Sequence, residues 1–230
     1  MKLLALETAT EACSVAVYVD GDVHARFEVA PRRHAELVLP WADALLADAG
    51  IARAQLDAVA VGKGPGAFTG VRMAIAVAQG IALALDRPVV PVSTLAALAM
   101  RAGGERRIAA IDARMGEVYL GLFKHDGDGL HPQGAEIVVA PGEAPLPEGD
   151  DWCGAGTGFA AAEAALVARL GDRLQAADAT ALPHAADLAW LAAQAYARGE
   201  AVAAERVEPA YLRNNVALTI AERAAQGIGR

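Results

Sequence analysis

The segment Val59–Arg72, Val-Ala-Val-Gly-Lys-Gly-Pro-Gly-Ala-Phe-Thr-Gly-Val-Arg, constrains the fold more than any other part of the chain. It places four glycines between a short apolar run and the helical pattern of residues 71–85. Glycine permits positive φ angles and close backbone contacts, and the free N–H groups of a helix N-terminus suit an anion or a partner's backbone. The spacing matches neither a P-loop nor a dinucleotide-binding motif, so a tight strand-to-helix connection is the alternative. The segment predicts a turn that lies against something else.

Length and charge limit the possible roles. With 230 residues, the chain can form two lobes of about 100 residues each. Its formal charge of −8 argues against unaided nucleic-acid binding, since phosphates require a dense Lys and Arg surface. The basic groups at 32–34 and 106–107 are small, and are typical of solvated turns or of local phosphate contacts inside a larger assembly.

Cysteine usage and hydropathy indicate the compartment. Cys13 and Cys153 form no metal-binding or disulfide motif, which favours a reduced environment. We find neither a signal-type segment nor an uninterrupted apolar run of about 18 residues. We therefore expect a cytoplasmic location and no membrane partner.

The apolar patterns predict an α/β protein with two lobes of related layout, joined at Gly103-Gly104. The predicted division is 1–103 for the N-terminal lobe, 104–213 for the C-terminal lobe and 214–230 for a tail. Strands are expected at Lys2–Leu6, Cys13–Val19, Val23–Val29, Leu56–Val61, Pro88–Val92, Arg107–Ile111, Glu117–Phe123 and Trp152–Ala155. Helices are expected at His34–Ala49, 71–85, from Ser93 or Thr94 to Met100, at Phe159–Leu170 and at His184–Arg198. Residues 125–134 are expected to form a loop.

The sequence offers little support for catalysis by metal or nucleophile. No two of the five histidines stand three or four residues apart on a helix, and no Gly-x-Ser-x-Gly motif occurs. Ser93 is better explained as a helix N-cap. Asp112, Arg114 and Glu117 surround a turn, where a salt-bridged hairpin and a general acid/base pair are both open interpretations. No metal ligands or catalytic residues are assigned.

The first hairpin carries a more specific pattern. Glu7 stands at a strand end and is followed by Thr8, Thr10 and a second strand. This resembles the phosphate-binding hairpin of the actin, Hsp70 and hexokinase superfold, where backbone N–H groups and hydroxyls approach ATP phosphates. A simple side-chain-capped turn remains the alternative.

Four motifs together resemble the bacterial TsaB (YeaZ) family over nearly the whole chain. They are Leu-Glu-Thr-Ala-Thr-Glu-Ala-Cys-Ser-Val-Ala at 6–16, Gly-Pro-Gly-Ala-Phe-Thr-Gly-Val-Arg at 64–72, Ala-Ile-Asp-Ala-Arg-Met-Gly-Glu-Val-Tyr at 110–119 and Pro-Ala-Tyr-Leu-Arg at 209–213. The resemblance implies the actin-like ATPase (ASKHA) superfold, with mixed central sheets flanked by helices. It also implies work with TsaD, TsaE and TsaC in making N6-threonylcarbamoyladenosine in tRNA, as a non-catalytic scaffold subunit.

The catalytic paralogue TsaD carries a histidine pair and a Ser-Gly-Gly-His-Thr phosphate loop that this chain lacks. The histidines align with Thr94 and Leu98, and the loop aligns with 112–116. Side chains at Ala113-Arg114 and the charge of Asp112 oppose phosphate binding. The resemblance therefore implies that Glu7, Thr8, Thr10 and Asp112 are a degenerate phosphate site, and that ATP and metal belong to the partner subunits.

The helix at 71–85 is the predicted partner interface, because even its more polar side is largely small and apolar. The interface residues are Arg72, Ala76, Gln79, Gly80 and Leu83. The resemblance implies a heterodimer with a TsaD-like subunit, a homodimer when the chain is alone, a TsaE-like ATPase in the larger complex, and tRNA contact only through that complex. Full burial of the helix is the alternative, and Trp41–Leu46 is a second candidate contributor.

Two other functions remain for comparison. An ATP-dependent small-molecule kinase of the same superfold would require a metal-anchoring acid at Glu7 or Asp112. A metallopeptidase is disfavoured because the chain has no His-Glu-x-x-His motif.

Overall fold

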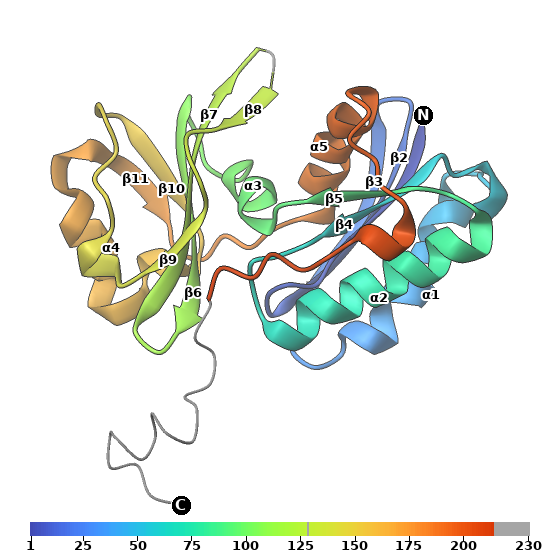
Figure 1. Ribbon diagram of the computed structural model, residues 1–230, viewed down its shortest axis with the longest axis horizontal. Helices are drawn as coiled ribbons and strands as arrows, with labels where there is room; N and C mark the ends of the chain where they lie inside the picture. The colour runs from blue at the N-terminus through green and yellow to red at the C-terminus, as the bar shows by residue number, and fades with distance from the viewer. Residues whose placement is uncertain (128, 214–230) are drawn as a thin grey trace, which may run out of the picture.

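Two mixed β-sheets stand side by side in the computed structural model, which describes residues 1–127 and 129–213 (Figure 1). The first sheet has the strand order β3-β2-β1-β4-β5. Its strands are β1 (Lys2–Glu7), β2 (Ala12–Val19), β3 (Asp22–Val29), β4 (Ala58–Gly62) and β5 (Val89–Val92). The second sheet has the order β11-β10-β6-β7-β8, with β9 paired to β7. Its strands are β6 (Arg106–Arg114), β7 (Glu117–Asp126), β8 (Gly129–Pro132), β9 (Ile137–Val139), β10 (Trp152–Ala155) and β11 (Leu174–Asp178).

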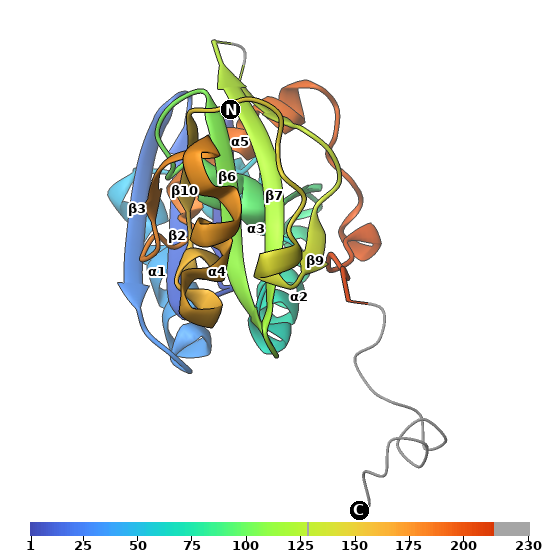
Figure 2. The ribbon, with the colours of Figure 1, turned by 90° about the vertical axis from the view of Figure 1, so that its left-hand side faces the viewer.

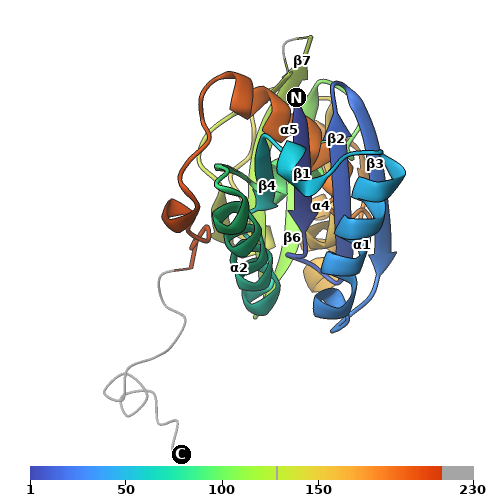
Figure 3. The same ribbon diagram turned by 90° about the vertical axis from the view of Figure 1, so that its right-hand side faces the viewer.

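Helices cover both faces of the first sheet, and this explains why residues 3–6 of its central strand are all apolar. Leu4 and Leu6 of β1 pack towards α1 (His34–Asp48) and α2 (Phe68–Leu85). Leu3, on the opposite face of β1, packs towards α5 (Ala185–Ala197). Seen from the first lobe, α1 and α2 lie on the viewer's side of the strands (Figure 3).

The second sheet repeats the layout of the first. In each sheet, three antiparallel strands are followed by two strands that run parallel to the first of them. A helix joins the fourth strand to the fifth in both lobes, α2 in the first and α4 (Ala161–Leu170) in the second. Figure 2 views the second sheet from the side that α4 covers. The prediction of two related lobes with mixed sheets is confirmed.

The lobes exchange the helix that follows the fifth strand. Helix α3 (Thr94–Ala99) follows β5 of the first sheet, yet Leu95 and Leu98 pack against residues of the second sheet. Helix α5 follows β11 of the second sheet and packs with Leu188 and Ala192 on the first. The predicted division at 103/104 thus assigns α5 to one lobe by sequence, while its apolar side chains lie in the core of the other.

Several predicted elements differ in detail. The predicted loop at 125–134 is wrong, because β7 and β8 form a hairpin there. The strands β9 and β11 were not predicted, since neither contains a fully buried residue. Helix α2 begins at Phe68, three residues earlier than expected. Ser93 caps α3 as expected, accepting hydrogen bonds from two backbone N–H groups. The predicted tail, 214–230, lies outside the described residues.

Candidate functional site

The glycine-rich loop between β4 and α2 lies against the turn between β1 and β2. A Cβ atom at Gly66 would stand 2.4 Å from the carbonyl oxygen of Ala9, and one at Gly70 would stand 2.1 Å from that of Thr8. The N–H of Ala67 donates to the Ala9 oxygen at 2.7 Å. The predicted neighbour of the loop is therefore the chain's own first turn, because only glycine allows the backbones to approach this closely.

Glu7 is buried beneath this loop and holds three segments together. Its Oε1 accepts a hydrogen bond from the Ala9 N–H at 2.7 Å, and its Oε2 accepts one from the Thr94 hydroxyl at 2.9 Å. The same hydroxyl accepts a bond from the Gly64 N–H at 3.2 Å. Burial raises the pKa of Glu7 from 4.5 to about 7, although these hydrogen bonds favour the charged form.

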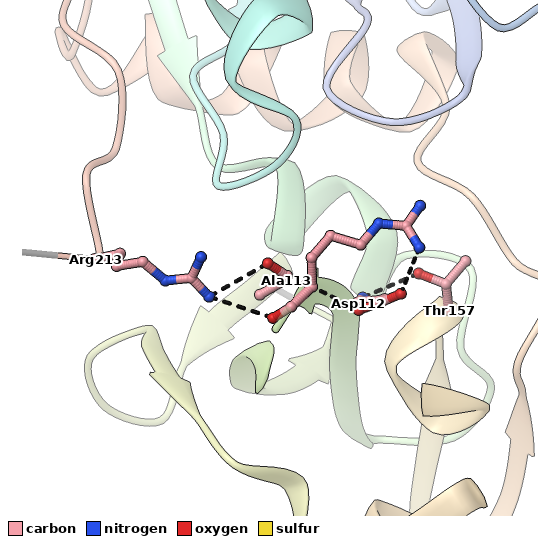
Figure 4. A network of polar contacts seen from close by, with 5 residues as sticks. Asp112, Ala113, Thr157 and Arg213 are labelled. Carbon is pink, nitrogen blue, oxygen red and sulfur yellow. Dashed lines mark hydrogen bonds and ion pairs between the residues drawn. The ribbon is translucent and has the colours of Figure 1, made fainter. Parts of the chain in front are cut away.

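The corresponding turn of the second lobe, between β6 and β7, is more open. Arg114 and Met115 adopt left-handed backbone angles, and the Met115 side chain is 86% exposed. Asp112 forms an ion pair with Arg114 at 2.9 Å and also accepts the Arg114 N–H. Its own N–H donates to the Thr157 hydroxyl at 3.1 Å (Figure 4). The structure supports the salt-bridged hairpin here.

A cleft of about 650 Å³ lies between the two turns. Thr10 and Asp112 line it, whereas Glu7 and Thr8 are not among its lining residues and are fully buried. The four candidates of the degenerate phosphate site are thus only partly brought together. Thr157 also lines the cleft and was not predicted. The Gly-Ala-Gly-Thr-Gly sequence at 154–158 is the signal that could have found it, because it spans the end of β10 as the first glycine-rich segment spans the end of β4.

Residues 204–213, here called the C-terminal strap, tie the two lobes together. The Gln79 side chain of α2 donates to the carbonyl oxygens of Ala204 and Val207 at 2.9 and 3.4 Å. At the far end, Arg213 pairs with Glu117. It also donates to the Ala113 oxygen (Figure 4). Gln79, predicted as a partner contact, therefore bonds within the chain.

The outer side of α2 is exposed and almost without charge. Ala76 and Gly80 are exposed, and Leu83 is 65% exposed. Val71, Ala74 and Ala78 on the other side face the core. Because one side is exposed, the alternative of full burial of the helix is wrong. We call Ala76, Gly80 and Leu83 the α2 surface. It adjoins an apolar groove of about 390 Å³ that is bounded by α1 and α2.

By length and composition, α2 is also the one helix among the described residues that could cross a membrane. Core helices of water-soluble proteins meet the same criterion, so this property is weak evidence on its own. Arg72 and Gln79 interrupt its apolar sequence, and its inner side packs on the first sheet.

The two positions that align with the metal-binding histidines lie in the core of this protein. Thr94 is fully buried in the Glu7 hydrogen-bond network, and Leu98 packs against the second sheet. Within residues 1–127 and 129–213, no three His, Cys, Asp or Glu side chains gather in a way that could hold a metal ion.

Comparisons with known proteins agree with this geometry. Residues 16–221 match the family model of TsaD, tRNA N6-adenosine threonylcarbamoyltransferase. The structure of YeaZ from Pseudomonas aeruginosa superposes with a TM-score of 0.86 at 50% identity, covering 92% of this chain and 99% of that one. The chain is therefore a two-lobed protein of the actin-like ATPase superfold, related to a tRNA-modifying transferase.

Named relatives give the particular family. The chain is 44% identical to the tRNA threonylcarbamoyladenosine biosynthesis protein TsaB of Escherichia coli (strain K12), covering 94% of this chain and 96% of that protein. It is 38% identical to TsaB of Haemophilus influenzae, covering 94% and 95%. The chain belongs to the TsaB family. The fold and family expected from the sequence motifs are confirmed, and the comparisons lend no support to a small-molecule kinase.

Proposed function

We propose that this chain is a non-catalytic scaffold subunit in the synthesis of N6-threonylcarbamoyladenosine in tRNA, and that it binds a TsaD-like catalytic subunit through the α2 surface. The observation that carries this proposal is the exposure of Ala76, Gly80 and Leu83 on an 18-residue helix whose other side is in the core. Small residues allow a partner helix to approach closely, and an exposed apolar helix face indicates a protein contact.

Contacts within the two turns support the proposal that this chain catalyses no reaction itself. The Ala67 N–H, which a phosphate would need, is bonded to the Ala9 oxygen. Asp112 and the Arg114 side chain occupy the second turn, where a phosphate would meet a carboxylate. These residues do not fit a nucleotide phosphate. ATP and metal chemistry then belong to the partner subunits, and no step is assigned to this chain.

The remaining parts of the proposal concern assembly and location. A TsaE-like ATPase joins the larger complex, and the chain contacts tRNA only through that complex, in keeping with its formal charge of −8. Without its catalytic partner, the chain forms a homodimer through the same α2 surface, so the two assemblies exclude each other. The complex works in the cytoplasm without a membrane partner.

The molar mass in solution tests the proposal. Light scattering after size exclusion is measured for the chain alone and mixed with the TsaD-like subunit, with and without ATP. We expect a heteromeric complex, and we expect Ala76→Glu to abolish it while the monomer stays folded. A carboxylate buried in the complex without a partner costs several kcal/mol, roughly 3 or more, and costs nothing in the monomer.

A matched control makes the test specific. Ala168→Glu introduces the same charge at an exposed position of α4, in the other lobe, and should leave the complex intact. If Ala76→Glu unfolds the isolated chain, the assigned surface is wrong. If no complex forms and the isolated chain hydrolyses ATP, the scaffold role is wrong.

A further inference from the structure

An arginine lies between two exposed aromatic rings at the mouth of the cleft. The Arg72 guanidinium carbon stands 3.2 Å from the ring centroid of Phe68 and 5.1 Å from that of Tyr211. Arg72 also donates to the Tyr211 hydroxyl at 2.5 Å. Phe68 is 65% exposed and Tyr211 is 58% exposed. A cluster that served only to hold the C-terminal strap would have its rings covered, since exposed aromatic surface is unfavourable in water.

Some of the arginines that line the cleft form ion pairs with carboxylates, and others do not. Arg114 and Arg213 also line it, and each forms an ion pair, with Asp112 and Glu117 respectively. Within the part of the chain that the structure describes, Arg32 and Arg72 pair with no carboxylate. Glu11 lines the cleft too and also forms no ion pair among these residues, so Arg32 and Arg72 together leave the cleft with an excess of positive charge in a protein whose formal charge is −8.

The walls of the cleft are largely apolar. Val71, Ile111 and Pro209 are among its lining residues, beside the aromatic rings at the mouth. Arg and aromatic residues in such surroundings are typical of the positions that dominate binding energy at protein interfaces. The cluster also begins where the α2 surface ends, because Phe68 and Arg72 belong to the first turns of the same helix.

We propose that the cleft mouth is a second docking site, which receives an acidic segment of the same catalytic subunit that covers the α2 surface. This inference rests on the proposed function. A carboxylate of the segment pairs with Arg72 between the two rings, a second pairs with Arg32, and an apolar neighbour enters the cleft. An acidic protein segment fits better than nucleic acid, because its apolar side chains can cover the apolar walls of the cleft, whereas a phosphate backbone has no apolar group to place there.

The test measures the affinity of the full chain for the TsaD-like subunit by calorimetry at several salt concentrations. Arg32→Gln is the first variant, since Arg32 has no ion pair among the described residues. Arg72→Gln is the second, and the double variant is the third. We expect about a tenfold loss of affinity in the double variant and a weaker salt dependence than in the wild type. Arg173→Gln, at an arginine of the second lobe that does not line the cleft, should match the wild type.

The outcomes separate this site from the α2 surface. If the wild-type complex forms, and neither its affinity nor its salt dependence changes in the double variant, the second site is wrong and the proposed function stands. If no wild-type complex forms, both proposals fail. If a single-stranded RNA oligonucleotide binds the isolated chain and Arg32→Gln and Arg72→Gln abolish that binding, the assigned occupant is wrong. Loss of affinity in Phe68→Ala, with unchanged thermal stability, would support the site.

Discussion

The β1–β2 turn and the β6–β7 turn occupy equivalent places in the two lobes, yet the chain uses them in opposite ways. The first is buried beneath the glycine loop, and Glu7 bonds to Ala9 and Thr94 on its inner side. The second is exposed, with Met115 projecting into solvent and Asp112 paired to Arg114. A repeated fold therefore does not require a repeated role, since one turn has become part of the core and the other a surface.

The largest expected effect concerns the buried turn. Gly70→Ala should destabilise the protein by roughly 3 kcal/mol or more, because the new Cβ would stand 2.1 Å from the carbonyl oxygen of Thr8. The free energy of unfolding in urea is the measurement. Gly80→Ala, in the same helix with no atom within 4 Å of the new Cβ, should instead stabilise by about 0.5–1 kcal/mol. Equal effects of the two changes would show that the close contact does not limit stability.

The second effect depends on pH and concerns Glu7. Its pKa is raised in the folded state, so the native protein binds this proton more tightly than the unfolded chain does. Burying the charged carboxylate lowers the free energy of unfolding. This loss is absent below pH 4.5, grows as the pH rises, and is complete above about 7. The stability of wild type should therefore fall, relative to Glu7→Gln, by about 2–3 kcal/mol between pH 4.5 and 8.

Thermal and urea unfolding across that pH range, with both proteins in parallel, measure the difference. A difference that stays constant with pH would mean that Glu7 ionises normally in the folded protein.

The smallest effect concerns the exposed turn. Asp112→Ala removes an ion pair with Arg114, whose side chain is 83% exposed, so stability should change by only about 0.5 kcal/mol or less. Asp112→Asn retains an acceptor for the Arg114 N–H and should be nearer still to wild type. A loss comparable to that of Gly70→Ala would contradict the contrast between the two turns.

Local signals were sufficient for much of the fold. The apolar runs located all strands of the first sheet, and Asp20-Gly21 adopts the positive φ angles expected at a hairpin turn. The strand β11, Leu-Gln-Ala-Ala-Asp, was missed because an edge strand with one large apolar residue shows no clear alternation. Similarly, the β7–β8 hairpin has a polar, glycine-containing sequence that is equally typical of a loop.

The site was less predictable, because it depends on contacts between distant segments. Helical spacing placed Gln79 on one side of the helix, and the family resemblance made that side the partner interface. Its side chain instead bonds to a strap more than 120 residues later in the chain. Ala76, Gly80 and Leu83, by contrast, are exposed. The sequence showed that the glycine loop needs a close neighbour, but the neighbour could be identified only once β1, β4 and α3 were placed together.

The exchange of α3 and α5 has a consequence for synthesis on the ribosome. Leu3 and Ala16 of the first sheet are covered by α5, which leaves the ribosome about 90 residues after β5 has emerged. At about 5–20 residues per second, that interval lasts roughly 5–20 seconds. During this time one apolar face of a nearly complete sheet has no covering helix. We therefore expect a chaperone to bind the exposed apolar face of the first sheet in the nascent chain until α5 has been synthesised.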